Sequence, residues 1–260
     1  MPIITDAYFY AVAVPAVLLV GISKSGFGTG FGSLAVPLMA LALPVPKVVA
    51  ILLPLLAVMD VLGLRALWRE RDAALLKLLL PAGLVGTLIG WALFSALSAT
   101  TVAALVGALT LLFLAVQLLR SRHPSHGLQP ALVATPTPRR WLGRVLAATS
   151  GFTSFVAHAG GPPIGFYVLP LKLAPLQYTA TMAVFFAAIN AAKWLPYTWL
   201  GLIDTGGLLT SLVLAPLAPL GVWLGVRIVK VVPQALFYRL VHTGLALTGA
   251  KLLWDGLRAA

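Results

Sequence analysis

The sequence predicts an all-α protein that crosses a membrane several times. Sixty per cent of its 260 residues are hydrophobic, only 9% are charged, and the mean hydropathy is +1.01. A soluble domain has about 45–50% apolar and about 25% charged residues. Apolar stretches that match the roughly 20 residues needed to cross a hydrocarbon core recur along the whole chain. We therefore expect a polytopic membrane protein without a separate soluble domain, in which the first apolar stretch belongs to the mature fold.

The chain contains a duplication. "PAGLVGTLIG" at 81–90 and "PLAPLGVWLG" at 216–225 have Pro, Gly and Gly in the same register, 135 residues apart. Ala50 and Asp60 are ten residues apart, as are Ala180 and Asn190. This spacing predicts a first transmembrane repeat at 1–120, a linker at 121–140 and a second repeat at 141–260.

Each repeat divides into five hydrophobic elements. In the first repeat they are expected at 8–22, 25–43, 47–64, 74–97 and 99–119, and in the second at 141–157, 161–174, 176–199, 207–226 and 235–254. An odd number of crossings inverts the second repeat relative to the first. Because two of the elements are short or broken, the pattern allows ten spans, or eight full spans plus two partial, re-entrant ones.

Loop charges indicate the same inversion. The loop at 65–71 has three arginines and its counterpart at 200–206 has no cation, whereas the uncharged loop at 98–101 corresponds to the basic stretch at 227–239. Inverted repeats place equivalent loops on opposite sides, and the cytoplasmic loop is the basic one. We therefore expect the basic linker at 120–144 in the cytoplasm and both termini outside.

The excess of 18 Lys and Arg over six Asp and Glu has the same explanation. No nucleic-acid partner is predicted, because the chain has no surface of interleaved basic and aromatic residues.

The chain has no cysteines, which excludes disulfides, thiolate catalysis and cysteine-bound metals. We expect no cofactor and no metal. The sequence has no nucleotide-binding loop motif, so the energy for transport has to come from ion or substrate gradients. The oligomeric state stays open.

Two glycine-rich stretches interrupt the predicted helices. "GFGTGFG" at 26–32 is a poor helix, since each glycine costs about 1 kcal/mol relative to alanine. "HAGGPP" at 158–163 is the counterpart in the second repeat. Unwound backbone at membrane depth is tolerated only where it is buried in protein or lines a polar cavity. Two such breaks in inverted halves predict a central binding site. Gly86, Gly90, Gly221 and Gly225, in contrast, have the i, i+4 spacing of close helix packing.

The chemistry of the breaks favours an anionic ligand. A helix that begins just after Gly32 or Gly161 would direct backbone N–H groups and its positive end at an oxyanion. Ser23, Thr29, Thr153 and Ser154 add hydroxyl donors. The predicted substrate-binding residues are Lys24, Ser25, Gly26, Gly28, Gly30, His158, Gly160, Gly161, Asn190 and Lys193.

Ionisable residues inside apolar stretches need a reason, since each costs about 2.5–3.5 kcal/mol on insertion scales. Asp60 is interpreted either as the partner of Arg65 or another cation, or as a proton-coupling carboxylate. His158 is a candidate for the same coupling, or a structural histidine. Lys193 lies three residues after Asn190 on nearly the same helix face. It is expected to contact the anion, to snorkel, or to pair with Asp60.

The motifs also resemble a known family. "GFGTGFGSLAVPLMA" at 26–40 and "GFTSFVAHAGGPPIGFYVLP" at 151–170 are similar to those of the TauE/SafE sulfite exporter family, the 4-toluene sulfonate uptake permeases. The resemblance covers nearly the whole chain. It implies a bacterial inner-membrane carrier for sulfite, sulfonates or other small organic anions. His158, Pro162 and Pro163 depart from the family's glycine run, so the substrate is not specified.

Together these features predict a secondary transporter for a small anion, working by alternating access, and not an enzyme. Proton coupling and the direction of transport stay open. One alternative is an anion channel. Another is an intramembrane hydrolase, because Ser154 and His158 lie one helical turn apart.

Overall fold

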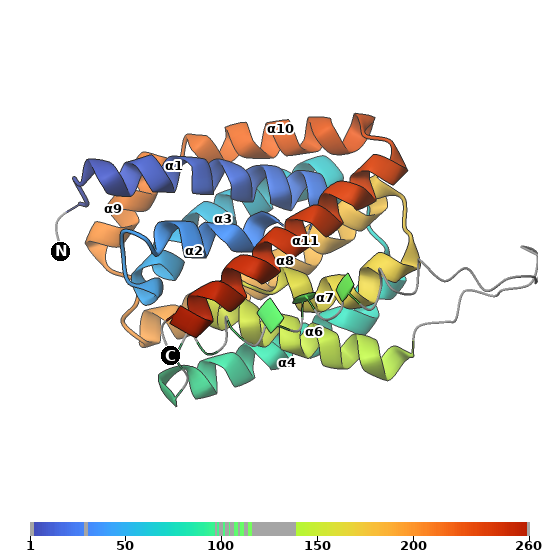
Figure 1. The fold of residues 1–260 in the computed structure, drawn as a ribbon, viewed down its shortest axis with the longest axis horizontal. Helices are drawn as coiled ribbons and strands as arrows, with labels where there is room; N and C mark the ends of the chain where they lie inside the picture. Colours follow the sequence, from blue (N-terminus) through green and yellow to red (C-terminus); the bar gives the residue numbers. More distant parts are fainter. Residues whose placement is uncertain are drawn as a thin grey trace, which may run out of the picture.

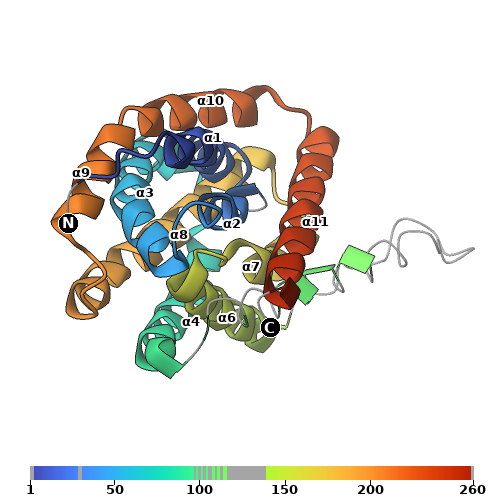
Figure 2. The ribbon, with the colours of Figure 1, turned by 60° about the vertical axis from the view of Figure 1, so that its left-hand side comes forward.

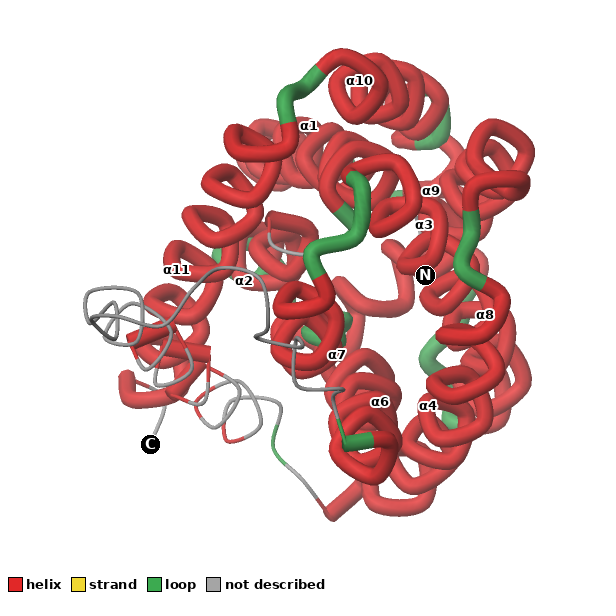
Figure 3. Tube along the Cα trace, turned by 90° about the vertical axis from the view of Figure 1, so that its right-hand side faces the viewer, coloured by secondary structure: helices red, strands yellow, loops and turns green. Residues whose placement is uncertain are grey.

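The computed structural model describes residues 3–28, 31–96 and 139–258, together with single positions between 98 and 115. Within these residues every regular element is helical, as the all-α prediction requires (Figure 3). Most of the predicted element at 99–119 and nearly all of the linker at 121–140 lie outside the described residues, so nothing in the structure tests them.

The described residues of the first half contain four α-helices with irregular helical turns between them. They are α1 (Ala7–Ile22), continued by the π-helical turn η1 (Ser23–Phe27), the 3₁₀ turn η2 (Phe31–Leu34) with α2 (Ala35–Met39), α3 (Val45–Leu67) and α4 (Ala73–Leu93). Short 3₁₀ turns follow α3 and α4, at Trp68–Glu70 and Phe94–Ala96. The first helical stretch therefore ends at Phe27, five residues later than predicted, and carries Lys24 and Ser25 at its end.

The second half contains six α-helices. They are α6 (Arg140–Ala157), α7 (Gly161–Val168) with the 3₁₀ turn η5 (Leu169–Leu171), α8 (Pro175–Trp199), α9 (Thr205–Leu214), α10 (Leu217–Val231) and α11 (Gln234–Arg258). The predicted single element at 207–226 is instead two helices, α9 and α10, bent by 48° at the break between them.

Several helices have the length and composition of membrane spans. Three stretches in the described chain qualify, Ala7–Phe27, Val45–Glu70 and Ala73–Leu93, and the bent pair α9–α10 makes up to four. Aspartates fix the starts of three helices: the Asp6, Asp72 and Asp204 carboxylates accept backbone N–H bonds from Tyr8, Leu75 and Gly207 at 3.0, 2.9 and 2.6 Å. These acids are explained by capping. Asp60 is the buried exception in the part of the chain that is described.

Two close helix pairs lie on opposite sides of the molecule, α1 with α10 and α4 with α6, while α2, α3, α7 and α8 lie between them (Figures 1 and 2). Glycines permit both contacts. A Cβ placed on Gly221 would lie 3.0 Å from the Gly21 Cα, and one on Gly86 would lie 1.8 Å from the Ala148 carbonyl oxygen. Gly90 and Gly225 meet neighbouring backbone in the same way. The predicted packing role of these glycines is confirmed.

Candidate anion-binding site

Both glycine-rich stretches end a helix on a residue with positive φ. The first ends at Gly28, with φ 67° and ψ −47°, and the second at His158, with φ 49° and ψ 26°. Histidine is one of the side chains enriched in this left-handed region. The turn at His158 is closed by backbone hydrogen bonds. The His158 N–H donates to the Ser154 carbonyl oxygen at 3.1 Å, and the Ala159 N–H donates to the Thr153 carbonyl oxygen at 3.2 Å.

The helix starts beyond the breaks provide fewer amide donors than the sequence suggests. Beyond the first break, η2 leads into α2, which has only five residues. Beyond the second, α7 begins at Gly161, and Pro162 and Pro163 occupy its first turn. Proline has no N–H, so two of the usual free donors of this helix start are missing. Side chains must therefore supply most of the donors for a ligand.

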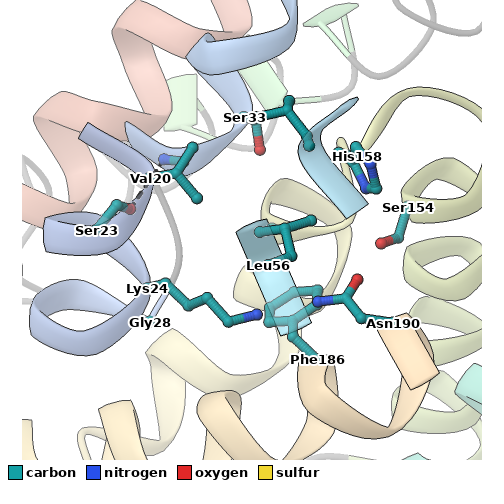
Figure 4. A pocket seen from close by; sticks show the side chains of 13 residues that line it. Val20, Ser23, Lys24, Gly28, Ser33, Leu56, Ser154, His158, Phe186 and Asn190 are labelled. Carbon is teal, nitrogen blue, oxygen red and sulfur yellow. Dashed lines mark hydrogen bonds between the residues drawn. The ribbon is translucent and has the colours of Figure 1, made fainter. Parts of the chain in front are cut away.

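A cavity of about 70 Å³ lies between the two breaks. It has room for several water molecules, since one needs about 10–15 Å³ on this measure. Figure 4 shows its polar groups and its apolar wall. The lining residues are Val20, Ser23, Lys24, Gly28, Gly32, Ser33, Leu52, Leu56, Ser154, His158, Gly161, Phe186 and Asn190.

Asp60 joins the two halves behind this cavity. Its Oδ1 lies 2.6 Å from the Lys24 Nζ, and its Oδ2 accepts a hydrogen bond from the Asn190 Nδ2 at 2.9 Å. Asp60 is 7% exposed and the Lys24 side chain 9% exposed. Arg65, in contrast, is exposed. The cation that balances Asp60 is therefore Lys24 from the first break.

Lys193 is fully buried, and its ammonium group has neutral partners. The Nζ donates to the Ser154 Oγ at 2.8 Å, to the His158 Nδ1 at 3.0 Å and to the Asn190 Oδ1 at 3.1 Å. An ammonium group has three protons, so all three are used. Lys193 neither snorkels nor pairs with Asp60 directly, because Asn190 stands between them.

The contacts of His158 determine which nitrogen carries its proton. The Nε2 lies 3.0 Å from the Val49 carbonyl oxygen, which only accepts, so the Nε2 carries the proton and donates. The Nδ1 then accepts from Lys193, and the imidazole is neutral. The Val49 carbonyl belongs to α3, so the imidazole joins the second break to this helix.

Comparison with known proteins identifies the family. The family model described as "Sulfite exporter TauE/SafE" matches residues 13–252, nearly the whole chain. The chain belongs to the TauE/SafE family. It is thus a member of a membrane transporter family associated with sulfite and related anions. Neither the comparison with curated proteins nor that with solved structures found a match.

In this TauE/SafE chain, five of the predicted binding residues line the cavity: Lys24, Gly28, His158, Gly161 and Asn190. Two further predicted residues, Lys193 and Asp60, lie immediately behind the lining and bond to it.

The other predicted binding residues lie elsewhere. Ser25 is 1% exposed and its hydroxyl has no hydrogen-bond partner in the described chain. Gly26 packs against Gly225, and the Gly160 carbonyl accepts from the Ser150 hydroxyl at 2.6 Å. Thr29 and Gly30 lie outside the described residues. The Thr153 hydroxyl donates to the Ala159 carbonyl at 3.1 Å, so it holds the second break closed.

Sequence reasoning missed Ser33 and the apolar wall of the TauE/SafE cavity. Leu56 and Phe186 each precede a polar network residue, Asp60 and Asn190, by four positions on the same helix. Residues four apart share a helix face, so this spacing was an available signal. No sequence signal pointed to Leu52 or Val20, because they are apolar residues in apolar helices.

Proposed function

We propose that this TauE/SafE chain is a secondary transporter for a small anion, such as sulfite, an organosulfonate or a carboxylate. One observation carries the proposal: a small buried cavity is lined by Lys24, three serines and His158, and backed by the fully buried Lys193. A buried ammonium group without a carboxylate is costly unless a counter-charge is supplied. A bound anion supplies it.

We further propose that residues 1–120 and 141–260 form inverted repeats that exchange their packing partners. The contact of α1 with α10 has its counterpart in that of α6 with α4. The positive-φ residues of the two breaks, Gly28 and His158, are 130 positions apart, and so are Asp60 and Asn190. These correspondences support alternating access by rocking of one half against the other. The linker at 120–144 is proposed to lie in the cytoplasm of a bacterial inner membrane, with both termini outside.

Proton coupling is proposed to involve Asp60, with His158 as the second group. A divalent anion that binds between Lys24 and Lys193 competes with the Asp60 carboxylate for the Lys24 ammonium group. A buried carboxylate deprived of its cation is costly, and taking up a proton removes its charge. Binding of a divalent anion and of a proton then favour one another, which is the requirement for symport.

The test is uptake of labelled sulfite and a labelled sulfonate into proteoliposomes, with and without a pH gradient. Lys24→Met is expected to reduce uptake of both anions severely, because the cation that lines the cavity is removed. Lys230→Met is the matched control, since Lys230 is an exposed lysine on α10. Asp60→Asn is expected to abolish the response to the pH gradient. Undiminished uptake by Lys24→Met would refute the proposed site.

The two alternatives are separated by the same preparation. A channel does not show accelerated exchange of labelled for unlabelled anion against a gradient, whereas a carrier does. For the hydrolase, the Ser154 and His158 side chains both bond to the Lys193 Nζ, and among the described residues no hydrogen bond links the two directly. A transporter with Ser154→Ala retains activity at reduced affinity, whereas loss of a nucleophile abolishes turnover.

A further inference from the structure

The polar network at the cavity has an unequal number of charges. The described ionisable groups in it are Lys24, Asp60, Lys193 and His158. The Lys24 ammonium is balanced by the Asp60 carboxylate, and His158 is neutral because its Nε2 donates to Val49 while its Nδ1 accepts from the Lys193 ammonium. Lys193 is left with three neutral acceptors. The empty site therefore has a formal charge of +1.

We propose, building on the proposed transport function, that this excess charge makes the site selective for the charge of its substrate: one net negative charge is accepted in each turnover. A monovalent anion makes the buried site neutral. A divalent anion leaves one uncompensated negative charge among side chains that are mostly buried, and isolated buried charges are strongly unfavourable.

The geometry explains how Lys193 acts without touching the substrate. The Ser154 Oγ accepts a hydrogen bond from the Lys193 Nζ and Ser154 lines the cavity, so the Ser154 hydroxyl proton is available to an anion there. A hydroxyl polarised by an ammonium group is a stronger donor than an isolated one. Ser154 is thus a binding residue, and Lys193 is a positioning residue that supplies the charge from behind.

A divalent anion enters only if Asp60 first takes up a proton, which raises the charge of the site to +2. The groups that face Asp60 are Lys24 on η1 and Asn190 on α8, with Lys193 beyond Asn190. The cations of α10, which also packs on α3, are the exposed Arg227 and Lys230. Monovalent anions then need no proton, whereas divalent anions require one.

Methanesulfonate and sulfate provide the test, because they are tetrahedral and close in size but carry one and two charges at neutral pH. Binding is measured by competition against labelled methanesulfonate, which stays monovalent at every pH used, with the full chain in lipid nanodiscs. Methanesulfonate is expected to bind at least about tenfold more tightly than sulfate, the ratio expected when one unbalanced charge costs 1.4 kcal/mol or more. In Asp60→Asn the order reverses, because the site then carries +2. Asp255→Asn, at the far end of α11, is the control and retains the wild-type order.

A second measurement keeps the proposal testable if Asp60→Asn does not fold. In the wild-type protein, sulfate binding is expected to strengthen as the pH falls, while methanesulfonate binding stays constant. Equal affinities for the two anions at neutral pH, or an unchanged order in folded Asp60→Asn, would overturn charge selection and leave anion transport intact. Absence of any competition or uptake, labelled sulfite included, would instead contradict the proposed function.

Discussion

The two breaks use the same backbone device but differ in their charges. Each ends a helix on a residue with positive φ, Gly28 or His158. The side chain four residues before each of them lines the cavity. It is Lys24 in the first break and Ser154 in the second. Lys24 is a cation that meets a carboxylate of its own half, whereas Ser154 is a neutral group that meets a cation of its own half, Lys193.

The difference makes the two proposed repeats chemically asymmetric. In the first half, the positive charge of Lys24 in the break is cancelled by the negative charge of Asp60 on α3. In the second half, the corresponding helix position holds Asn190 in place of an acid, and Lys193 adds an unbalanced charge. The excess charge of the site therefore comes from the second half, while the bond between Asn190 and Asp60 joins the halves.

The largest expected effect comes from removing that excess charge. Lys193→Met is expected to lower anion uptake by about 100-fold, since two opposite charges about 6 Å apart interact by about 3 kcal/mol at an effective dielectric constant of about 20. Its thermal unfolding temperature is expected to change little, because the lost hydrogen bonds are offset by removal of a buried charge. Uptake and unfolding are measured on the same detergent preparation, with Lys230→Met as the control. Uptake near the wild-type rate would locate the excess charge elsewhere.

Ser154→Ala tests whether the second break contributes a donor. The variant is expected to bind anions about tenfold more weakly, because hydrogen bonds to charged groups contribute about 1.5–3 kcal/mol. Thr149→Ala, one turn earlier on α6 and facing away, controls for a lost hydroxyl on this helix. A competition assay against labelled sulfite measures both. Equal affinity in the two variants would mean that Lys193 acts on the anion without Ser154.

Gly28→Ala and His158→Asn compare the backbones of the breaks. A Cβ on Gly28 would lie 3.0 Å from the Met182 Cβ, at a φ that side chains rarely adopt. We expect Gly28→Ala to lower the free energy of unfolding by about 1–2 kcal/mol. Asparagine is tolerated in the left-handed region, so His158→Asn is expected to cost less. Thermal unfolding monitored by intrinsic fluorescence provides the measurement. A larger loss in His158→Asn would show that the imidazole contacts outweigh the backbone.

The smallest effect is expected for Ser25→Ala. The Ser25 hydroxyl is buried without a hydrogen-bond partner in the described residues, and such groups cost about 1–3 kcal/mol. The variant is therefore expected to transport anions normally and to unfold at the same or a slightly higher temperature. Uptake assays and thermal unfolding measure this. A clear loss of affinity would return Ser25 to the binding residues that the sequence predicts.

Particular residues show what could be predicted. The repeat register pointed to Asp60 and Asn190 together, and the structure places them 2.9 Å apart. The helix end at Ala157 and the start at Gly161 follow from the local sequence "HAGGPP", because glycine and proline act on the backbone of their own turn. The end of the first stretch was placed five residues early, since a π-helical turn continues it through Lys24 to Phe27.

The sequence by itself determined the apolar helices, the capped starts and the positions of the two breaks. These features depend on composition and on residues within a turn of one another. Only the tertiary structure decided that Asp60 forms its ion pair with Lys24 and that Lys193 has neutral hydrogen-bond partners. A charge is balanced by whichever groups lie within a few ångströms of it, and here those groups come from helices as far as 130 residues apart in the chain.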